Sequence, residues 1–159
     1  MQKRKFRKST IFKICLVIAV VIANIVSFSQ KIDANKQYNL SESEILSTYR
    51  EKHHTMVYIT MLAEREFEAN VKLFCGNSCI CHISVPEKAV LDISCNNGLG
   101  EGKLLFEKKA DNTIQTVVLE HDKTDVTMEA GEYDVFLVGK WFSRKFDLQS
   151  ENIIFEIKT

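Results

Sequence analysis

The sequence predicts an all-β fold, an antiparallel β-sandwich of the jelly-roll or immunoglobulin-like type, preceded by an N-terminal signal or transmembrane helix and a short second helix. Two patterns in the 159 residues support this prediction. From residue 55 onward, short strand-like runs follow one another between turn clusters with no long helical pattern, which is typical of a sandwich or barrel. Before them, a basic head leads into an apolar run, an arrangement that targets a chain to a membrane.

The N-terminal segment, residues 1–29, has the composition of a signal peptide or a membrane anchor, with a basic head and no acidic residue. Its nearly unbroken apolar run, 14–28, is shorter than the roughly 20 residues that span a bilayer, which favours a signal peptide cleaved after Ser29. If the apolar segment is taken as residues 11–28, with the Lys13 side chain reaching the membrane interface, its length favours an anchor that stays in the membrane. Both alternatives predict an extracytoplasmic protein, either secreted or single-pass with its C-terminal domain outside.

Charge is divided unevenly along the chain. Six of the 21 Lys and Arg residues lie in residues 1–29, so the rest of the chain carries 15 basic against 21 acidic side chains, a net charge of −6. Nucleic acid and anionic lipid both require a basic face. The acidic balance therefore argues against nucleic acid as a partner of the exported part.

Residues 30–54 are predicted to be a tether that contains a short helix. The stretch 31–38 is polar and lacks a hydrophobic period. Ser41, with Glu44 three residues later, has the spacing of a capping box, and a short apolar stripe follows it. We therefore expect a helix over about 41–53.

Residues 55–159 are predicted to be the β-sandwich domain. Apolar and polar side chains alternate over residues 66–75, the period of a half-buried strand. The run 132–138 is apolar on both faces, which predicts a central strand. Further strand-like runs, separated by turn clusters, cover residues 79–85, 89–95, 103–107, 113–120, 125–128, 144–148 and 153–157.

The end of this domain resembles a known family. Residues 125–139 read DVTMEAGEYDVFLVG, and KFDL follows at 145–148. The pattern leads from an apolar strand through Ala130, Gly131 and Tyr133 into a central strand. In this it resembles the closing strands of bacterial pre-peptidase C-terminal type (PPC-like) extracellular β-sandwich domains. The resemblance implies an exported accessory module, of the kind attached to secreted enzymes, that contacts carbohydrate or protein.

Four cysteines lie in the exported part, Cys75, Cys79, Cys81 and Cys95. An even number in an oxidising compartment predicts a disulfide framework. If the GNS and PEK turn clusters are three-residue hairpin loops, Cys79 lies opposite both Cys75 and Cys95, with all four side chains on one face. We then expect the bonds Cys79–Cys95 and Cys75–Cys81, which is one of three connectivities.

Two alternatives for these cysteines stay open. They can be thiols buried in the core, or thiolates around a metal ion, with Cys79 and Cys81 as a chelating pair. Structural zinc sites usually show two Cys-x-x-Cys pairs, and the second is missing here, so metal is the weaker alternative. We expect His82 to point away from the four sulfurs, because side chains alternate along a strand.

The expected ligand-contact surface consists of Lys140, Trp141, Phe142 and Arg144. The segment joins two strand-like runs, so we expect the two aromatic side chains on a hairpin loop, where large aromatics are either packed or used. Exposed and flanked by basic residues, they have the make-up of an interface anchor or a sugar-stacking platform. The alternative is that Trp141 plugs the edge of the core.

No nucleophile elbow, zinc-protease motif or dinucleotide fingerprint is recognisable in the sequence, so we expect neither enzymatic activity nor a cofactor. The predicted function is a non-catalytic binding or accessory module at the cell surface, whose partner is a cell-envelope protein or carbohydrate. The alternative is a secreted structural or partner-assembly subunit. A third hypothesis is an extracytoplasmic metal-binding protein that uses the cysteine cluster.

Overall fold

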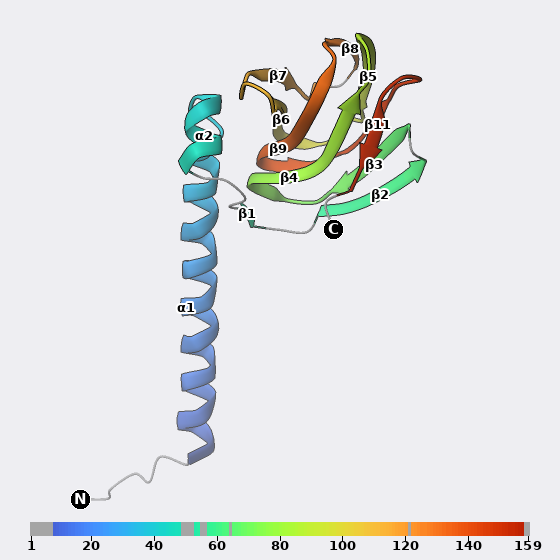
Figure 1. Cartoon of the computed structure of the whole chain (residues 1–159). Helices are drawn as coiled ribbons and strands as arrows, with labels where there is room; N and C mark the ends of the chain where they lie inside the picture. The colour runs from blue at the N-terminus through green and yellow to red at the C-terminus, as the bar shows by residue number, and fades with distance from the viewer. Residues whose placement is uncertain (1–7, 49–52, 55–56, 64, 121, 158–159) are drawn as a thin grey trace, which may run out of the picture.

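The computed structural model describes residues 8–48, 53–54, 57–63, 65–120 and 122–157. Two helices precede two antiparallel β-sheets that pack face to face (Figure 1). The predicted fold class, a β-sandwich behind an apolar N-terminal helix and a short helix, is confirmed. The strands are β1 His53–His54, β2 Val57–Ala63, β3 Glu66–Val71, β4 Phe74–Val85, β5 Ala89–Cys95, β6 Leu99–Lys108, β7 Ile114–Val118, β8 Lys123–Met128, β9 Gly131–Ser143, β10 Lys145–Gln149 and β11 Ile154–Glu156.

Helix α1 covers Lys8–Gln37 and contains an apolar stretch, Phe12–Ser29, that is long enough to cross a membrane and is not buried by the rest of the chain. The helix continues through residues 31–37, which the sequence analysis interpreted as a tether. Extending a formed helix costs much less than nucleating one. An exposed ion pair between Lys36 Nζ and Asp33 Oδ1, 3.3 Å apart and three residues apart in sequence, lies on this extension.

Helix α2 covers Glu42–Thr48 and is shorter than the predicted 41–53, of which residues 49–52 lie outside the described residues. Its first backbone bond runs from the Ile45 amide to the Ser41 carbonyl at 3.0 Å, which places Ser41 at the N-terminal cap. Two glutamates in the first turn complement the positive end of the helix dipole. The predicted start of this helix is therefore confirmed.

The strands form two sheets. Sheet A has the order β1-β4-β9-β6-β7, with β11 also paired to β4, and sheet B has the order β2-β3-β10-β5-β8. All the strand pairs are antiparallel. Strand β9 belongs to sheet A and β10 to sheet B, so the chain passes from one sheet to the other at Arg144. This corner carries the segment that was expected to be a hairpin loop.

The main hydrophobic core lies between the sheets, where aromatic rings from both sheets approach one another. The Phe146 ring lies 6.4 Å from Phe67 and 6.3 Å from Phe142, centroid to centroid. Val135 of β9 faces this core, while Phe136 faces a second, smaller cluster on the outside of sheet A. Strand β9 lies between β4 and β6, so the predicted central strand with two apolar faces is confirmed.

The second cluster joins the helices to the outer face of sheet A. Ile45 and Leu46 of α2 pack against Leu105, Phe136 and Val138. Each fully buried large aliphatic or aromatic side chain contributes about 1.5–3 kcal/mol relative to exposure. Helix α2 is thereby held against the sheet by hydrophobic contact.

The predicted hairpin register of the cysteine segment is wrong. Strand β4 runs without a turn from Phe74 to Val85, and its Gly76, Asn77 and Ser78 pair with β9 instead of forming a loop. After Val85 the chain crosses to sheet B, so β4 and β5 are not neighbours. A polar cluster such as GNS resembles a turn in sequence, but here the residues pair with a strand that lies about sixty positions later in the chain.

Candidate functional site

The four residues of the expected contact surface lie in different environments at the corner between the sheets. Lys140, Trp141 and Phe142 belong to strand β9 and not to a hairpin loop. Phe142 is completely buried in the main core, whereas Trp141 is half-buried. Lys140 Nζ pairs with Glu101 Oε1 at 3.1 Å. Phe142 therefore serves the core, and ligand contact by Trp141 stays a prediction.

Arg144 has a structural role at the same corner. Its two terminal nitrogens donate hydrogen bonds to the carbonyl oxygens of Leu119 and Gly100, each at 3.1 Å. Its guanidinium carbon lies 5.9 Å from the centre of the Phe142 ring, a cation–π distance. The side chain thus ties β9 to neighbouring segments.

Two residues at the corner between the sheets, Gly100 and Trp141, have a positive φ. Trp141 has a φ of 55°, and the pairing of β6 with β9 shifts register between Leu99 and Glu101. Gly100 lies inside this bulge with a φ of 77°, and a Cβ there would collide with the Trp141 carbonyl. The bulge depends on glycine at this position, because no larger residue fits so close an approach.

The cysteines are distributed over both sides of sheet A. Cys81 and Cys95 lie in the core between the sheets, and Cys79 packs against the outer cluster. None of the five cysteines forms a disulfide in the structure. Since β4 and β5 belong to different sheets, Cys79 is not opposite Cys95, and the register on which that predicted bond depended is wrong. The Cys75–Cys81 bond stays a prediction, while the four sulfurs do not share one face.

Burial determines the acidity of the two core thiols. It raises the pKa of the Cys81 thiol well above the ordinary value, with further contributions from Cys79 and Asp134. It also raises the pKa of the Cys95 thiol, which a hydrogen bond from Arg144 partly offsets. Both are therefore protonated at neutral pH, which makes them poor nucleophiles and poor metal ligands.

A polar cluster lies on the outer face of sheet A. His82 Nδ1 and Asp134 Oδ1 are 2.6 Å apart, and Lys109 Nζ lies 3.0 Å from the same oxygen. Cys79 completes the group, because its sulfur, one His82 ring nitrogen and a carboxylate oxygen all lie within 4.8 Å of one another. His82 was expected to point away from all four cysteine sulfurs, and for Cys79 this expectation is wrong.

Ion pairing dominates the electrostatics of this cluster. Partial burial acts to raise the pKa of the Asp134 carboxyl, but hydrogen bonds from Lys109 and His82 outweigh it and hold this pKa below its usual value. The hydrogen bond to Asp134 in turn raises the pKa of the Lys109 ammonium. Asp134 is therefore an anion at neutral pH.

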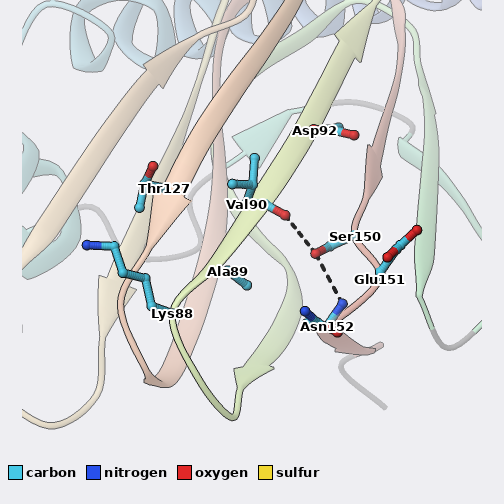
Figure 2. A pocket seen from close by; sticks show the side chains of 8 residues that line it. All are labelled: Lys88, Ala89, Val90, Asp92, Thr127, Ser150, Glu151 and Asn152. Carbon is cyan, nitrogen blue, oxygen red and sulfur yellow. Dashed lines mark hydrogen bonds between the residues drawn. The ribbon is translucent and has the colours of Figure 1, made fainter.

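The outer face of sheet B carries an open pocket of about 550 Å³ (Figure 2). It lies across β5 and β8 and is closed on one side by the turn after β10. Ser150 Oγ donates to the Val90 carbonyl at 2.7 Å and accepts from the Asn152 amide at 3.4 Å, which fixes this turn. The lining residues are Lys88, Ala89, Val90, Asp92, Thr127, Ser150, Glu151 and Asn152.

The sequence analysis did not find this pocket. Its lining comes from three separate segments, around residues 88–92, at Thr127 and at 150–152, and only the pairing of β5 with β8 and β10 brings them together. The SEN turn before the last strand was the one local signal. This turn lines a pocket only because β5 and β8 lie beside it, and the spacing of residues in the sequence does not reveal these neighbours.

No family model and no curated protein matches this chain. Among solved structures, the chain is similar to ligand-free BiXyn10A CBM1, at 10% identity and a TM-score of 0.34, covering 68% of this chain and 93% of that one. It is also similar to the carbohydrate-binding module CBM6cm-2 of Cellvibrio mixtus lichenase 5A in complex with cellotriose. The sequence identity is 11% and the TM-score 0.34, and the match covers 69% of this chain and 92% of that one. A third similar structure is an RmlC-like cupin protein from Desulfovibrio desulfuricans, with 11% sequence identity and a TM-score of 0.28. This match covers 74% of this chain and 92% of that one. Since these TM-scores are low, the fold class rests on the strand pairing described above.

Proposed function

We propose that the chain is an extracytoplasmic, non-catalytic β-sandwich binding module, held at a membrane by α1 or released from it by cleavage. One observation carries the proposal: the apolar stretch Phe12–Ser29 leaves its side chains exposed and leads directly to the sandwich. Exposed apolar side chains all round a helix are costly in water and favourable in lipid. The basic head before them favours a cytoplasmic amino end, which places the sandwich outside.

Contacts after residue 29 support a close attachment of the sandwich to this helix. Gln37, at the end of α1, is 5% exposed, and its Oε1 accepts a hydrogen bond from Nδ2 of the fully buried Asn77 at 3.4 Å. Helix α2 packs beside it on the same face of sheet A. In Figure 1 the sandwich lies beside the C-terminal end of α1. An anchored module of this kind has sheet A engaged with its own helices, which leaves the outer face of sheet B for a ligand.

The pocket on sheet B is the ligand site that the geometry supports best, and its chemistry suits a carbohydrate of the cell envelope. Asp92, Glu151 and Asn152 offer acceptors and donors of the kind that sugar hydroxyls require. Lys88 is paired with Glu129 at 2.7 Å, so the pocket does not present an unbalanced positive charge to an anion. Ligand contact by Trp141 at the corner is the second candidate, since this residue is only partly buried and an aromatic ring is a common platform for a sugar.

Topology is tested on the full chain in membranes. We expect the protein to resist alkaline extraction if α1 is retained, and protease added outside the membrane to digest the sandwich. An intact mass lacking residues 1–29 indicates the cleaved form and agrees with the proposal equally well. A full-length protein that is soluble and protected inside the cell contradicts it.

Ligand binding is tested by presenting the detergent-purified full chain to an array of cell-envelope polysaccharides. We expect Asp92→Ala and Asn152→Ala to weaken binding, and Glu156→Ala, an exposed residue on β11, to leave it unchanged. Trp141→Ala as the only variant that weakens binding moves the site to the corner. Absence of any glycan binding, with one envelope protein retained stoichiometrically, favours the partner-assembly role instead.

A further inference from the structure

We infer that Cys79, His82 and Asp134 form a binding site for a divalent transition-metal ion of the zinc class on the outer face of sheet A. The site is separate from the sheet B pocket and goes beyond the proposed function. It also differs from a four-cysteine site, because Cys79 is the only cysteine in it. The three candidate ligand atoms lie within 4.8 Å of one another, and each of their residues is half-buried.

A β-bulge creates this juxtaposition. In a regular strand, residues 79 and 82 would point to opposite faces because their separation is odd. The register of β4 on β9 shifts between Cys79, opposite Phe136, and Cys81, opposite Val135, so one extra residue is accommodated on β4. Ile80 and Cys81 both face the inner core as a result. Cys79 and His82 consequently share the outer face.

The register also supplies the third ligand. His82 pairs directly with Asp134, and Asp134 and Phe136 are two residues apart on β9, so they share a face. The side chains of His82 and Asp134 are 25% and 20% exposed. An ion can therefore reach them from solvent without opening the core.

The donor set has the chemistry of a zinc site. Thiolate, imidazole and carboxylate bind Zn²⁺ at about 2.3, 2.0–2.1 and 2.0–2.2 Å, and three protein ligands leave a fourth tetrahedral position open. That position can take water or a donor from a partner. On binding, the Cys79 thiol releases its proton to solvent, the His82 ring proton that faces Asp134 moves from Nδ1 to Nε2 so that Nδ1 can bind the ion, and no electron is transferred.

The present distances describe a hydrogen-bonded cluster that must rearrange slightly around an ion. Tetrahedral ligation requires the 2.6 Å between His82 Nδ1 and Asp134 Oδ1 to widen to about 3.3 Å, given bonds of this length. Lys109, whose side chain is 48% exposed, can withdraw from Asp134, since the ion replaces its positive charge. Both movements are side-chain rotations at the surface.

The test uses the full chain in detergent, reduced and treated with chelator, then titrated with Zn²⁺ by calorimetry and with Co²⁺ by absorption spectroscopy. We expect one ion per chain and, with Co²⁺, an intense thiolate-to-metal charge-transfer band together with the visible bands of a tetrahedral site. The Co²⁺ spectrum of the unaltered protein needs no variant. A spectrum without the thiolate band overturns the proposal.

Variants then identify the ligands. Cys79→Ser, His82→Gln and Asp134→Asn should each lower the Zn²⁺ affinity at least about tenfold, and Cys79→Ser should abolish the charge-transfer band. Matched controls are Cys15→Ser, an exposed thiol on α1, and Asp147→Asn, a carboxylate that bonds Ser94 on sheet B. Retention of the charge-transfer band in Cys79→Ser, or an equal loss of Zn²⁺ affinity in the control variants, overturns the assignment. Far-ultraviolet circular dichroism verifies that each variant is folded.

Discussion

The two faces of strand β4 differ in composition and in what they can do. The inner face carries Phe74, Ile80 and Ile83, all buried in the core between the sheets. The outer face carries Cys79 and His82, beside the helices and partly open to solvent. The inner face contributes to stability through close packing, while the outer face carries two side chains that can bind a metal ion together with Asp134 of β9. The bulge between Cys79 and Cys81 interrupts the alternation of the strand and places Cys79 on the same face as His82.

The inner face should show the largest effect on stability. Phe74→Ala removes a fully buried ring from the core, which should reduce the free energy of unfolding by about 3–5 kcal/mol. Ser84→Ala, on the outer face of the same strand, removes one hydrogen bond to Glu132 and should lower it by only about 0.5–1.5 kcal/mol. Denaturant unfolding of the detergent-purified full chain measures both. Equal losses in the two variants would remove the distinction between the faces.

Thiol reactivity should separate the faces next. In reduced, chelator-treated protein, half-buried Cys79 should be alkylated about tenfold or more faster than buried Cys81, whose pKa is raised by burial. Peptide mass spectrometry after timed alkylation measures the two rates. Denatured protein, in which both cysteines should react alike, is the control. If Cys81 reacts first, the two thiols do not lie on the faces described here. If both cysteines become reactive only after stronger reduction, they form disulfides, as the sequence predicted.

The smallest expected effect is on pH dependence at the outer face. Because the pKa of Asp134 is held below its ordinary value of 3.8 in the folded protein, its ion pairs stabilise the fold above that pH, and their contribution falls as pH drops through the lowered pKa. The stability difference between the unaltered protein and Asp134→Asn should therefore shrink below pH 3.8. Unfolding curves at a series of pH values measure it. A difference that grows with acid would reverse the assigned direction.

Much of the fold could be predicted from the sequence, and the reasons are local. Alternation over residues 66–75 and apolar residues on both faces of 132–138 identify strands β3 and β9, because a strand buries its side chains with a period of two. Ser41 marks the start of α2 by its capping chemistry. Each of these features depends only on near neighbours in the chain.

The candidate sites could not be predicted in the same way. The GNS cluster is polar enough for a turn, yet it lies inside β4 because β9 covers it. A bulge adds one residue and leaves no compositional mark, so His82 was expected to point away from Cys79, beside which it lies. Trp141 was expected on a loop but lies in a strand with a positive φ, opposite a glycine that is distant in sequence. Long-range pairing determines all three.

The decisive property of the outer face is the position of Cys79 relative to His82. Nuclear Overhauser effects in the isotope-labelled full chain in detergent micelles report which side chains are close. We expect direct effects from the Cys79 methylene to the His82 ring and to Phe136, since these groups share the outer face. Effects from Cys79 to Cys95 in the inter-sheet core, with none to the His82 ring, would contradict this placement.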